Sequence, residues 1–496
     1  MEKYDLIVIG SGPGGFAAAM RAYDFGKKIC LIEENLIGGA GIMNGALTSK
    51  TMWELSADYS IAAATDRGYR AAGLLVDYEQ VRKTVIQAAK EKQYQLLSQI
   101  ETCSKERPGK GSIILKCGRA SFLDKNTVKI TEKAKEELVF GQYIIVATGS
   151  IPRELEDLPT DGKMIFNSDS ILNLKKFPER MVVIGSGIIG CEFATIFSNY
   201  KQTEVHLLDR TNRVIPFEDN DLSDFVSKNL ENSGVKIHYE AKLKEIIKKD
   251  DYLEVVLDYE DGHSKVFEVD IALVSIGRIP NTKNLGLENI GEICNRSGLI
   301  ATDEFCDIKK LKGVDNIYAV GDITGHGQLY NIAQHQGRFT VEKIFNNLSE
   351  KINYKNMSTL MFFKPEIAAV GLNEKQLQLQ KTPYKVAIYS NRLVNRNIAM
   401  RNTNGFVKII VSNDGKDRIL GMRAASPQAS AFIISVAHLI DEENGLSEVR
   451  KTVHPHPGVT EGIEDCLRLF DQSSVFKPEA FPDLIQYREW LPQETE

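Results

Sequence analysis

Three glycines near the start of the chain have the spacing of a turn that binds phosphate. Gly10, Gly12 and Gly15 follow an apolar, strand-like run at residues 6–9, and Glu33 ends the next such run. Glycine allows a tight turn and close approach of a pyrophosphate, the helix N-terminus attracts its charge, and the acid accepts hydrogen bonds from ribose hydroxyls. This pattern predicts a dinucleotide site. The plainer alternative is a strand-to-helix turn that needs glycine only for a positive φ.

The same pattern occurs a second time. Gly185, Gly187 and Gly190 follow the apolar run 181–184, and Asp209 ends the next run. Two such units in one chain indicate two bound dinucleotides and a fold in which strands alternate with helices.

The composition favours a multidomain protein that acts on small molecules. At 496 residues with 43% hydrophobic content, the chain has room for roughly three domains of about 100–200 residues each. The 61 basic and 67 acidic residues are well mixed and give a net charge of −6, so we expect no nucleic-acid partner. The seven cysteines have no close partner in sequence, which argues against a metal site or a secreted disulfide framework and indicates reduced thiols.

We expect a cytoplasmic protein without a membrane span. Residues 1–5 lead at once into the first strand-like run, which leaves no room for a signal or transit peptide. No apolar stretch approaches the ~20 residues that cross a bilayer.

The pattern changes after residue 345. Alternating strands such as 405–411 and a helix of small residues near 424–440 predict a third, α+β domain. The tail 471–496 is richer in proline and aromatic residues, and we expect it to lie over a neighbour rather than to form a core element.

Three further segments extend the pattern over the chain. Residues 146–150 end a strand where the first unit passes to the second, 275–282 mark the return, and 318–322 lead back into the first unit. Together with the glycine turns, they resemble the pyridine nucleotide-disulfide oxidoreductases, and dihydrolipoamide dehydrogenase in particular, from Lys3 to about Phe470.

The resemblance implies an α/β fold with two interleaved Rossmann-like dinucleotide-binding domains, for FAD and NAD, and a C-terminal α+β dimerisation domain that forms a homodimer. The expected segments are 1–150 (FAD-binding domain, first part), 151–277 (NAD-binding domain), 278–345 (FAD-binding domain, second part), 346–470 (dimerisation domain) and 471–496 (C-terminal extension).

The resemblance also implies the residues that hold FAD and NAD(H). Glu33 is expected at the adenosine ribose of FAD and Asp322 at its ribityl chain, although Asp322 also suits a simple turn after glycine. The cofactor-binding residues implied are Gly10, Gly12, Gly15, Glu33, Thr148, Gly149, Gly321, Asp322, Gly185, Gly187, Gly190, Asp209, Gly277 and Arg278.

The acid of the second unit bears on the choice of nicotinamide nucleotide. Asp209 suits a ribose 2′-hydroxyl and repels a 2′-phosphate, which favours NADH over NADPH. Arg210 and Arg213 weaken this interpretation because a basic group there could reach a phosphate, and both are equally consistent with solvated surface positions.

The resemblance fails at the redox-active thiols. Gly41 and Ala46 take the places of a cysteine pair separated by four residues, and neither can supply a thiolate. Cys30 and Cys191 are expected to be small core residues. Cys466 is expected on a helix after the motif of His456, too far along it to take the place of the missing thiols. Because Gly and Ala are smaller than the residues they replace, we expect a small vacancy at these positions or a site for an electron acceptor.

Two charged pairs implied by the resemblance are retained. Lys50 and Glu192 are expected to form an ion pair beside the flavin, with ordinary surface charges as the alternative. His456, oriented by Glu461, is the expected acid/base across the dimer interface, or else an interface residue left without a role.

These observations predict an FAD-dependent enzyme that passes electrons from NADH to an acceptor other than a disulfide. That acceptor could be a nicotinamide nucleotide, a quinone, oxygen or a protein, as in a diaphorase or a soluble transhydrogenase. One alternative is a catalytically degenerate dimeric scaffold or an NAD-responsive binding protein. Another is a true dihydrolipoamide dehydrogenase, which the missing thiols make chemically implausible.

Overall fold

The computed structural model describes residues 1–71, 73–105, 107–291, 294–308 and 314–492. Its first sheet has a parallel part and an antiparallel extension, in the order β3-β2-β1-β6-β5-β4, with β17 also paired to β6. The strands are β1 (Glu2–Ile9), β2 (Lys28–Glu33), β3 (Ser112–Cys117), β4 (Arg119–Phe122), β5 (Thr127–Glu132), β6 (Lys135–Val146) and β17 (Ile317–Ala319). Strands β1, β2, β3, β6 and β17 run parallel, β5 pairs antiparallel with β6, and β4 pairs antiparallel with β5.

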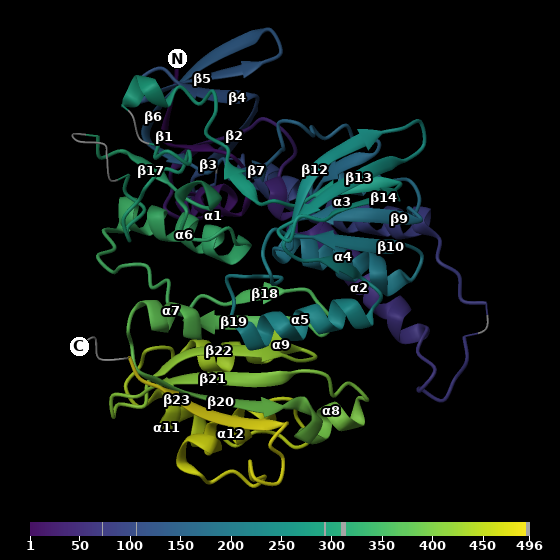
Figure 1. Ribbon diagram of the computed structural model, residues 1–496. Helices are drawn as coiled ribbons and strands as arrows, with labels where there is room; N and C mark the ends of the chain where they lie inside the picture. The colour runs from purple at the N-terminus through teal and green to yellow at the C-terminus, as the bar shows by residue number, and fades with distance from the viewer. Residues whose placement is uncertain (72, 106, 292–293, 309–313, 493–496) are drawn as a thin grey trace.

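A distant segment of the chain completes this first unit. Helices α1 (Pro13–Asp24) and α6 (Tyr330–Asn346) pack against each other beside the sheet (Figure 1). Because β17 and α6 follow the second glycine turn in sequence, the two units are interleaved.

The second unit is built on a parallel five-stranded sheet in the order β11-β10-β9-β15-β8. Its strands are β8 (Ile165–Asn167), β9 (Arg180–Ile184), β10 (Glu204–Leu208), β11 (Lys236–His238) and β15 (Ile271–Val274), with helices α4 (Ile188–Tyr200) and α5 (Asn220–Asn232). An antiparallel sheet of β12 (Ala241–Lys248), β13 (Leu253–Tyr259) and β14 (Ser264–Val269) adjoins it. The chain crosses between the units on β7 (Ser150–Pro152) and β16 (Arg278–Pro280), which pair antiparallel.

Two long helices follow the first glycine turn. Helix α2 (Ala46–Ala62) packs against α4, and α3 (Tyr78–Cys103) packs against α2. Asp77 begins α3 because its side chain accepts a hydrogen bond from the Gln80 N–H. The buried residues of α3 are spaced three, four or seven positions apart, so one face of the helix packs against the core. These residues are Tyr78, Val85, Ala89, Leu96, Ile100 and Cys103.

The third sheet is antiparallel, in the order β18-β19-β22-β21-β20-β23, and lies at the lower end of Figure 1. Its strands are β18 (Thr359–Met361), β19 (Ile367–Gly371), β20 (Tyr384–Ser390), β21 (Phe406–Ser412), β22 (Ile419–Ala425) and β23 (Ile485–Trp490). The accompanying helices are α7 (Glu374–Leu379), α8 (Asn395–Ala399), α9 (Ala429–Phe432), α10 (Ile434–Ala437), α11 (Gly445–Arg450) and α12 (Glu461–Leu467). Short 3-10 helices in the chain are η1 (Gly39–Gly41), η2 (Ile171–Asn173), η3 (Leu287–Ile290), η4 (Asp322–Thr324), η5 (Asn391–Leu393) and η6 (Arg468–Asp471).

One expectation about this third region is confirmed in part and another is wrong. The predicted helix near 424–440 is present as the short helices α9 and α10, but its first residues belong to β22, and a left-handed Gln428 separates that strand from the helices. The tail joins the sheet of its own chain: β23 pairs with β20, Ile485 is buried, and Trp490 stacks on Tyr384 with ring centroids 5.4 Å apart. Pairing with an exposed edge strand is the physical reason for this placement.

The crossovers at β7 and β16 lie beside residues 150 and 277, and we propose the five expected segments as the domain division of the chain. Among helices in the described ranges, none combines the length and apolar character needed to cross a bilayer.

Candidate active site

A cavity of about 2650 Å³ lies between the first two units, and residues of the third region, such as Phe362 and Arg423, also line it. Ligand pockets usually measure roughly 300–1,000 Å³, so this one has room for more than one ligand. Most of the expected site residues line it; the exceptions are Gly15, Gly190, His456 and Glu461.

The first glycine turn requires glycine for two different reasons. A Cβ at Gly10, where φ is +100°, would lie 2.5 Å from the Ala147 carbonyl oxygen, and one at Gly15 would lie 1.9 Å from the Gly10 oxygen. Both positions therefore require glycine, because any side chain there would overlap a neighbouring backbone oxygen. A Cβ at Gly12 would meet nothing within 4 Å, and Gly12 lines the cavity. The backbone at Gly12 is open to close approach by a ligand.

The second turn repeats this geometry. A Cβ at Gly185, with φ of +103°, would lie 2.7 Å from the Ser275 oxygen, and one at Gly190 would lie 1.9 Å from the Gly185 oxygen. Gly187, like Gly12, has open space where a Cβ would be.

The acids at the strand ends are held by the residue between the first two glycines of each turn. Glu33 accepts from the Ser11 N–H at 2.9 Å, the Ser11 hydroxyl at 2.6 Å and the Asn35 N–H at 2.8 Å. Asp209 accepts from the N–H and hydroxyl of Ser186 at 2.8 and 2.6 Å, and from those of Thr211 at 2.9 and 2.8 Å.

Burial raises the pKa of Asp209, but these donors outweigh burial and hold the pKa below its ordinary value. The carboxylate therefore carries a fixed negative charge beside the second turn. Arg213 forms an ion pair with Asp224, whereas Arg210 lines the cavity.

Both turns fit the pyrophosphate of a dinucleotide. Gly12 and Gly187 directly precede the first residues of helices α1 and α4, and neither N-terminus has a side-chain cap. Their first backbone N–H groups are thus available to an anion, next to glycines that leave the approach open. The donor pattern fits the cofactors that the fold implies.

A matched pair of alanine variants separates packing from ligand approach in the first turn. We expect Gly15→Ala to destabilise the protein by about 1–3 kcal/mol, because its methyl group would overlap a backbone oxygen. We expect Gly12→Ala to fold normally but to bind FAD at least about 10-fold more weakly, because its methyl group points into open space where a ligand approaches. Urea unfolding of the apoproteins and FAD titration measure the two effects. A Gly12→Ala protein with unchanged FAD affinity would contradict this assignment.

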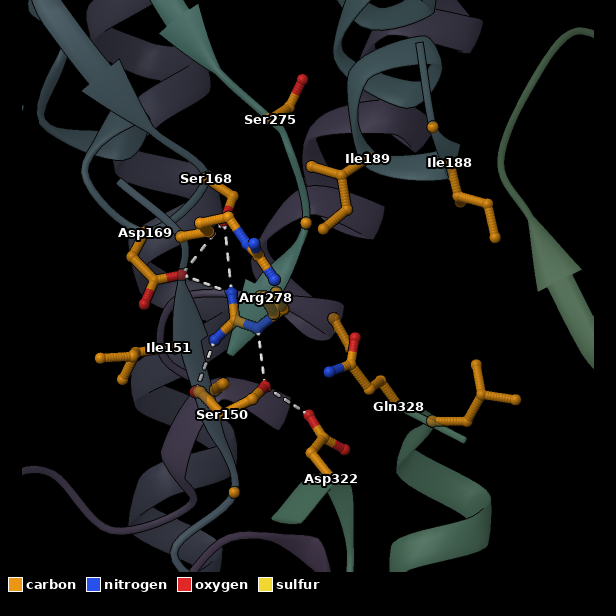
Figure 2. A pocket seen from close by; sticks show the side chains of 18 of the residues that line it. Ser150, Ile151, Ser168, Asp169, Ile188, Ile189, Ser275, Arg278, Asp322 and Gln328 are labelled. Carbon is orange, nitrogen blue, oxygen red and sulfur yellow. Dashed lines mark hydrogen bonds and ion pairs between the residues drawn. The ribbon is translucent and has the colours of Figure 1, made fainter. Parts of the chain in front are cut away.

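Arg278 ties the two units together at the cavity wall (Figure 2). Its Nε donates to the Ser150 hydroxyl at 2.9 Å, its Nη2 to the Ser150 carbonyl at 2.8 Å, and its Nη1 to Asp169 at 3.0 Å. The Ser150 hydroxyl in turn donates to Asp322 at 2.6 Å, and burial raises the pKa of Asp322. The expected ligand-binding side chain of Arg278 thus already makes protein contacts.

The remaining predicted backbone positions also meet at this wall. The Thr148 hydroxyl donates to the Asn281 carbonyl at 2.8 Å, and the Asn281 N–H donates to the Gly149 carbonyl at 2.9 Å. Gly277 and Gly321 have φ of +102° and +80°, a conformation that favours glycine.

Lys50 and Glu192 form an ion pair on the cavity wall. The Lys50 Nζ lies 2.8 Å from the Glu192 Oε2, and α2 and α4 carry the two residues. Phe362 holds both partners: its N–H donates to the Glu192 Oε1 at 3.0 Å, and its ring lies 4.8 Å from the Lys50 Nζ. Sequence analysis missed Phe362, because no spacing in the sequence connects it to this pair.

The loop that takes the place of the thiol pair is short and rich in glycine. The 3-10 helix η1 ends at Gly41, and α2 begins only at Ala46. A Cβ at Gly41 would lie 2.7 Å from the Pro13 Cγ and 2.8 Å from the ring of Tyr330. These two side chains fill the space that a Cβ of residue 41 would need, but Gly41 and Ala46 both line the cavity, and the vacancy or acceptor site expected here stays a prediction. Sequence analysis missed Tyr330 as well.

His456 and Glu461 lie together but away from the cavity of their own chain. The His456 Nδ1 is 2.7 Å from the Glu461 Oε1, and the Gly458 N–H donates to the Glu461 Oε2 at 2.9 Å. In Figure 1, α12 lies on the far side of the third sheet from α1. The histidine side chain is 64% exposed, so it is available to a partner subunit.

Of the described residues that line the cavity, none is a cysteine. Burial raises the pKa of Cys30 to about 12, and it also raises the pKa of Cys191 and Cys466. Buried thiols of this kind are poor nucleophiles.

Comparisons with known proteins agree with this architecture. The model of the pyridine nucleotide-disulphide oxidoreductase family matches residues 4–337, and that of its dimerisation domain matches residues 357–466. Dihydrolipoyl dehydrogenase of Chlamydia muridarum is 33% identical over 467 residues, which cover 93% of this chain and 95% of the relative. Dihydrolipoyl dehydrogenase of Bacillus subtilis is 30% identical over 460 residues, covering 92% and 94%.

Two solved structures share the fold. LpdA of Mycobacterium tuberculosis superposes with a TM-score of 0.84 at 23% identity, over 95% of this chain and all of that one. The HOCl-induced flavoprotein disulfide reductase RclA of Escherichia coli, in its Cu(II) complex, gives 0.82 at 24% identity, over 95% and 100%. With two interleaved nucleotide units and a dimerisation domain, the chain belongs to the pyridine nucleotide-disulphide oxidoreductase family.

Proposed function

We propose that this chain is a homodimeric FAD-dependent oxidoreductase that takes electrons from NADH and passes them to an acceptor other than a disulfide. One observation carries the proposal. The segment of residues 38–50, which ends in the first turn of α2, has Gly41 and Ala46 at the two thiol positions of the family, while Lys50 keeps its ion pair with Glu192. The chain thus retains residues for receiving hydride and lacks those for thiol-disulfide exchange.

The two glycine turns divide the cofactors between them. We assign the first, with Glu33 and Asp322, to FAD and the second, with Asp209, to NADH. The ionised carboxylate of Asp209 disfavours a 2′-phosphate, which supports NADH over NADPH. FAD held by these residues would supply the redox chemistry that links a hydride donor to an electron acceptor.

The side chains of this chain prepare the site for that transfer. Lys50 supplies a positive charge at the cavity wall, and Glu192, which is only 4% exposed, fixes its position while the Phe362 N–H holds the other carboxylate oxygen. A preorganised charge of this kind stabilises negative charge that develops during hydride transfer. The carboxylate of Glu461 orients His456, whose Nε2 can exchange a proton with an acceptor bound at the partner subunit.

Anaerobic titration with NADH tests the proposal. Without a redox disulfide, one equivalent of NADH per FAD should bleach the yellow protein completely, with no long-lived charge-transfer band from a thiolate. A requirement for two equivalents would reveal a hidden disulfide and contradict the proposal, as would brisk turnover of lipoamide. A protein that NADH does not bleach would instead support the scaffold alternative.

Thionicotinamide nucleotides then test one class of acceptor. Their reduction by NADH would identify transhydrogenation. If they are not reduced, that acceptor is excluded, and quinones, oxygen and proteins are tested in turn.

A further inference from the structure

The loop of residues 38–46 is folded so closely onto its surroundings that three of its positions, Gly38, Gly41 and Gly45, have no space for a side chain. A Cβ at Gly45 would lie 2.4 Å from the Ala40 carbonyl oxygen, and one at Gly41 would lie 2.7 Å from Pro13 and 2.8 Å from Tyr330. Gly38 and Gly39 have φ of +102° and +54°, so glycine also sets the turn that enters the loop.

Gly41 differs from Gly38 and Gly39 in its backbone conformation, and it differs from Gly45 because side chains and not a backbone oxygen lie where its Cβ would be. Its φ lies outside the left-handed region, so any residue could adopt its backbone conformation. Only the neighbouring atoms forbid a side chain. One obstacle is the ring of Pro13, which the start of α1 holds in place, and the other is the end of the longer Tyr330 side chain.

We propose that Tyr330 determines the type of acceptor, because its ring closes the position from which a thiol at residue 41 would act. This inference rests on the proposed function, in which residue 41 is the position of the family's first thiol. Tyr330 is the first residue of α6 and lines the cavity, and it is 39% exposed there. Gly41 lines the same cavity, and the ring occupies the space beside it that a side chain at residue 41 would need.

The proposal predicts that cysteines at 41 and 46 do not form a disulfide unless the Tyr330 ring is removed. Three variants test it: G41C/A46C, the same pair with Tyr330→Ala, and the same pair with Tyr330→Phe, which keeps the ring. Each protein is treated with diamide under denaturant-free conditions. In the reaction two S–H bonds break and one S–S bond forms, while two electrons and two protons pass to diamide, which becomes a hydrazine. Peptide mass spectrometry measures the fraction of the 41–46 cross-link, and the wild-type protein gives the background from its seven cysteines.

We expect at least about 10-fold more of the 41–46 cross-link in the alanine variant than in the other two. Equal cross-linking with Tyr330 present would overturn the proposal, as would equal cross-linking in the Tyr330→Phe variant or the absence of a cross-link in all three proteins. These readouts depend on space and not on electrons from NADH. They therefore remain valid if the NADH titration contradicts the proposed function.

A second measurement serves if the cysteine variants do not fold. Gly41→Ala should lower the melting temperature by about 2–8 °C, because its methyl group overlaps Pro13 and Tyr330. In a Tyr330→Ala background, the same substitution should lower it by no more than half as much, since the ring is the obstacle that has been removed. An equal effect in both backgrounds would show that Tyr330 does not close this position and would overturn the proposal.

Discussion

A Lys50→Met variant should retain FAD but be bleached by NADH about 100-fold more slowly than the wild-type protein. The ammonium of Lys50 is the positive charge that Glu192 and Phe362 hold at the cavity wall, at 2.8 Å from the carboxylate and 4.8 Å from the ring. Methionine has a similar length and no charge, so the substitution removes the electrostatic contribution and changes packing little. Anaerobic stopped-flow absorbance measures the rate.

Two controls give this result its meaning. Lys50→Arg keeps the charge and should lose much less activity. Lys110→Met removes an exposed lysine whose partner is Asp24 and should leave the rate unchanged. If NADH bleaches the Lys50→Met protein at a rate within about threefold of the wild-type rate, then the ion pair has a structural role only.

The parts of the site that the sequence predicted well are those encoded in short local patterns. Each glycine turn, with its strand, helix and acid, lies within about thirty residues, and its steric requirements are local: the Gly15 position is blocked by the Gly10 oxygen. The pairing of Lys50 with Glu192 connects residues 142 positions apart, and only the resemblance to a family brought them together.

The features that the sequence did not disclose depend on contacts between distant segments. Tyr330 faces Gly41 across almost three hundred residues, and Phe362 reaches Glu192 from the third unit. Strand β23 could not be recognised from its own residues, because its pairing depends on the free edge of β20. Residues 424–440 looked helical from their small side chains, but Ala424 and Ala425 are buried in β22, and packing overrides helix propensity there.

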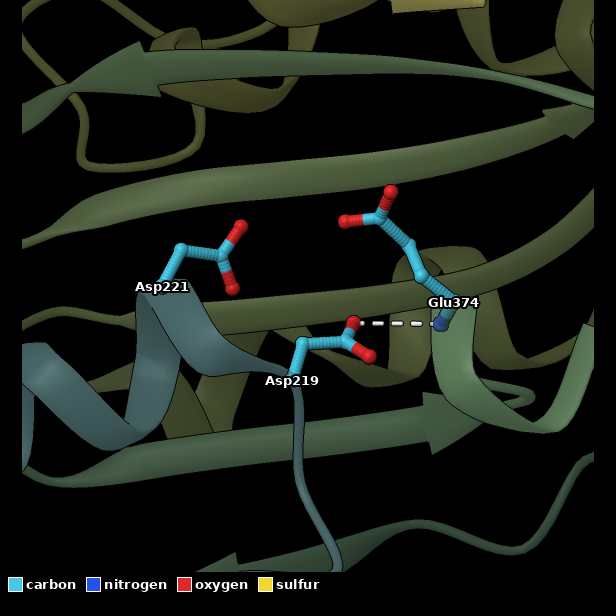
Figure 3. A group of neighbouring side chains, drawn as sticks. All are labelled: Asp219, Asp221 and Glu374. Atoms are coloured by element: carbon cyan, nitrogen blue, oxygen red, sulfur yellow. Dashed lines mark hydrogen bonds between the residues drawn. The ribbon is translucent and has the colours of Figure 1, made fainter. Parts of the chain in front are cut away.

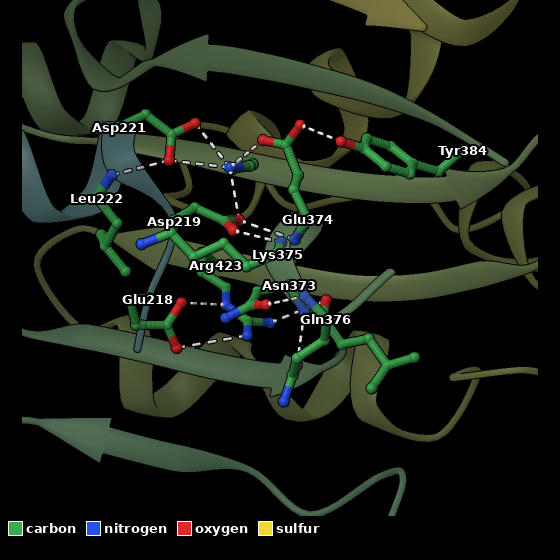
Figure 4. A network of polar contacts seen from close by, with 12 residues as sticks. Glu218, Asp219, Asp221, Leu222, Asn373, Glu374, Lys375, Gln376, Tyr384 and Arg423 are labelled. Carbon is green, nitrogen blue, oxygen red and sulfur yellow. Dashed lines mark hydrogen bonds and ion pairs between the residues drawn. The ribbon is translucent and has the colours of Figure 1, made fainter. Parts of the chain in front are cut away.

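A buried charge cluster joins the second unit to the third sheet and the tail. Asp219, Asp221 and Glu374 bring three carboxylates close together, an arrangement that could bind a metal ion (Figure 3). The Nζ of Lys408 lies among them, at 2.8 Å from Asp219 and 2.6 Å from each of Asp221 and Glu374. Figure 4 shows the three carboxylates within the surrounding network of polar contacts. Arg488 of β23 contacts Asp221 at 3.2 Å and also pairs with Glu374. An ammonium group thus already supplies positive charge to the cluster.

The pKa values in this cluster define the pH range over which it stabilises the fold. Burial lowers the pKa of Lys408, but Asp221 and its neighbours outweigh burial and raise the pKa above its ordinary value. Burial raises the pKa of Asp219, but the Lys408 charge outweighs it and the pKa is lowered. The contribution of Asp219 is therefore present above its unfolded pKa of about 4 and lost as pH falls through the folded value. That of Lys408 is present below its unfolded pKa of about 10.4 and lost as pH rises through the folded value.

Lys408→Met should reduce the free energy of unfolding by about 3–5 kcal/mol at pH 7, because buried carboxylates lose their main counter-charge. Lys385→Met is a matched control on the adjacent strand β20: its partner Asp417 is 48% exposed, and we expect a loss of about 0–1 kcal/mol. Urea unfolding at several pH values measures both losses. The difference in free energy of unfolding between the wild-type protein and Lys408→Met should become smaller below pH ~4, because the carboxylates take up protons there. Adding Asp221→Asn to Lys408→Met should recover part of the loss, because it removes one of the carboxylate charges that have lost the Lys408 ammonium and so lowers the repulsion among them. A Lys408→Met protein as stable as the control would mean that the carboxylates are neutral in the fold, and that the cluster does not join the second unit to the third sheet through charge.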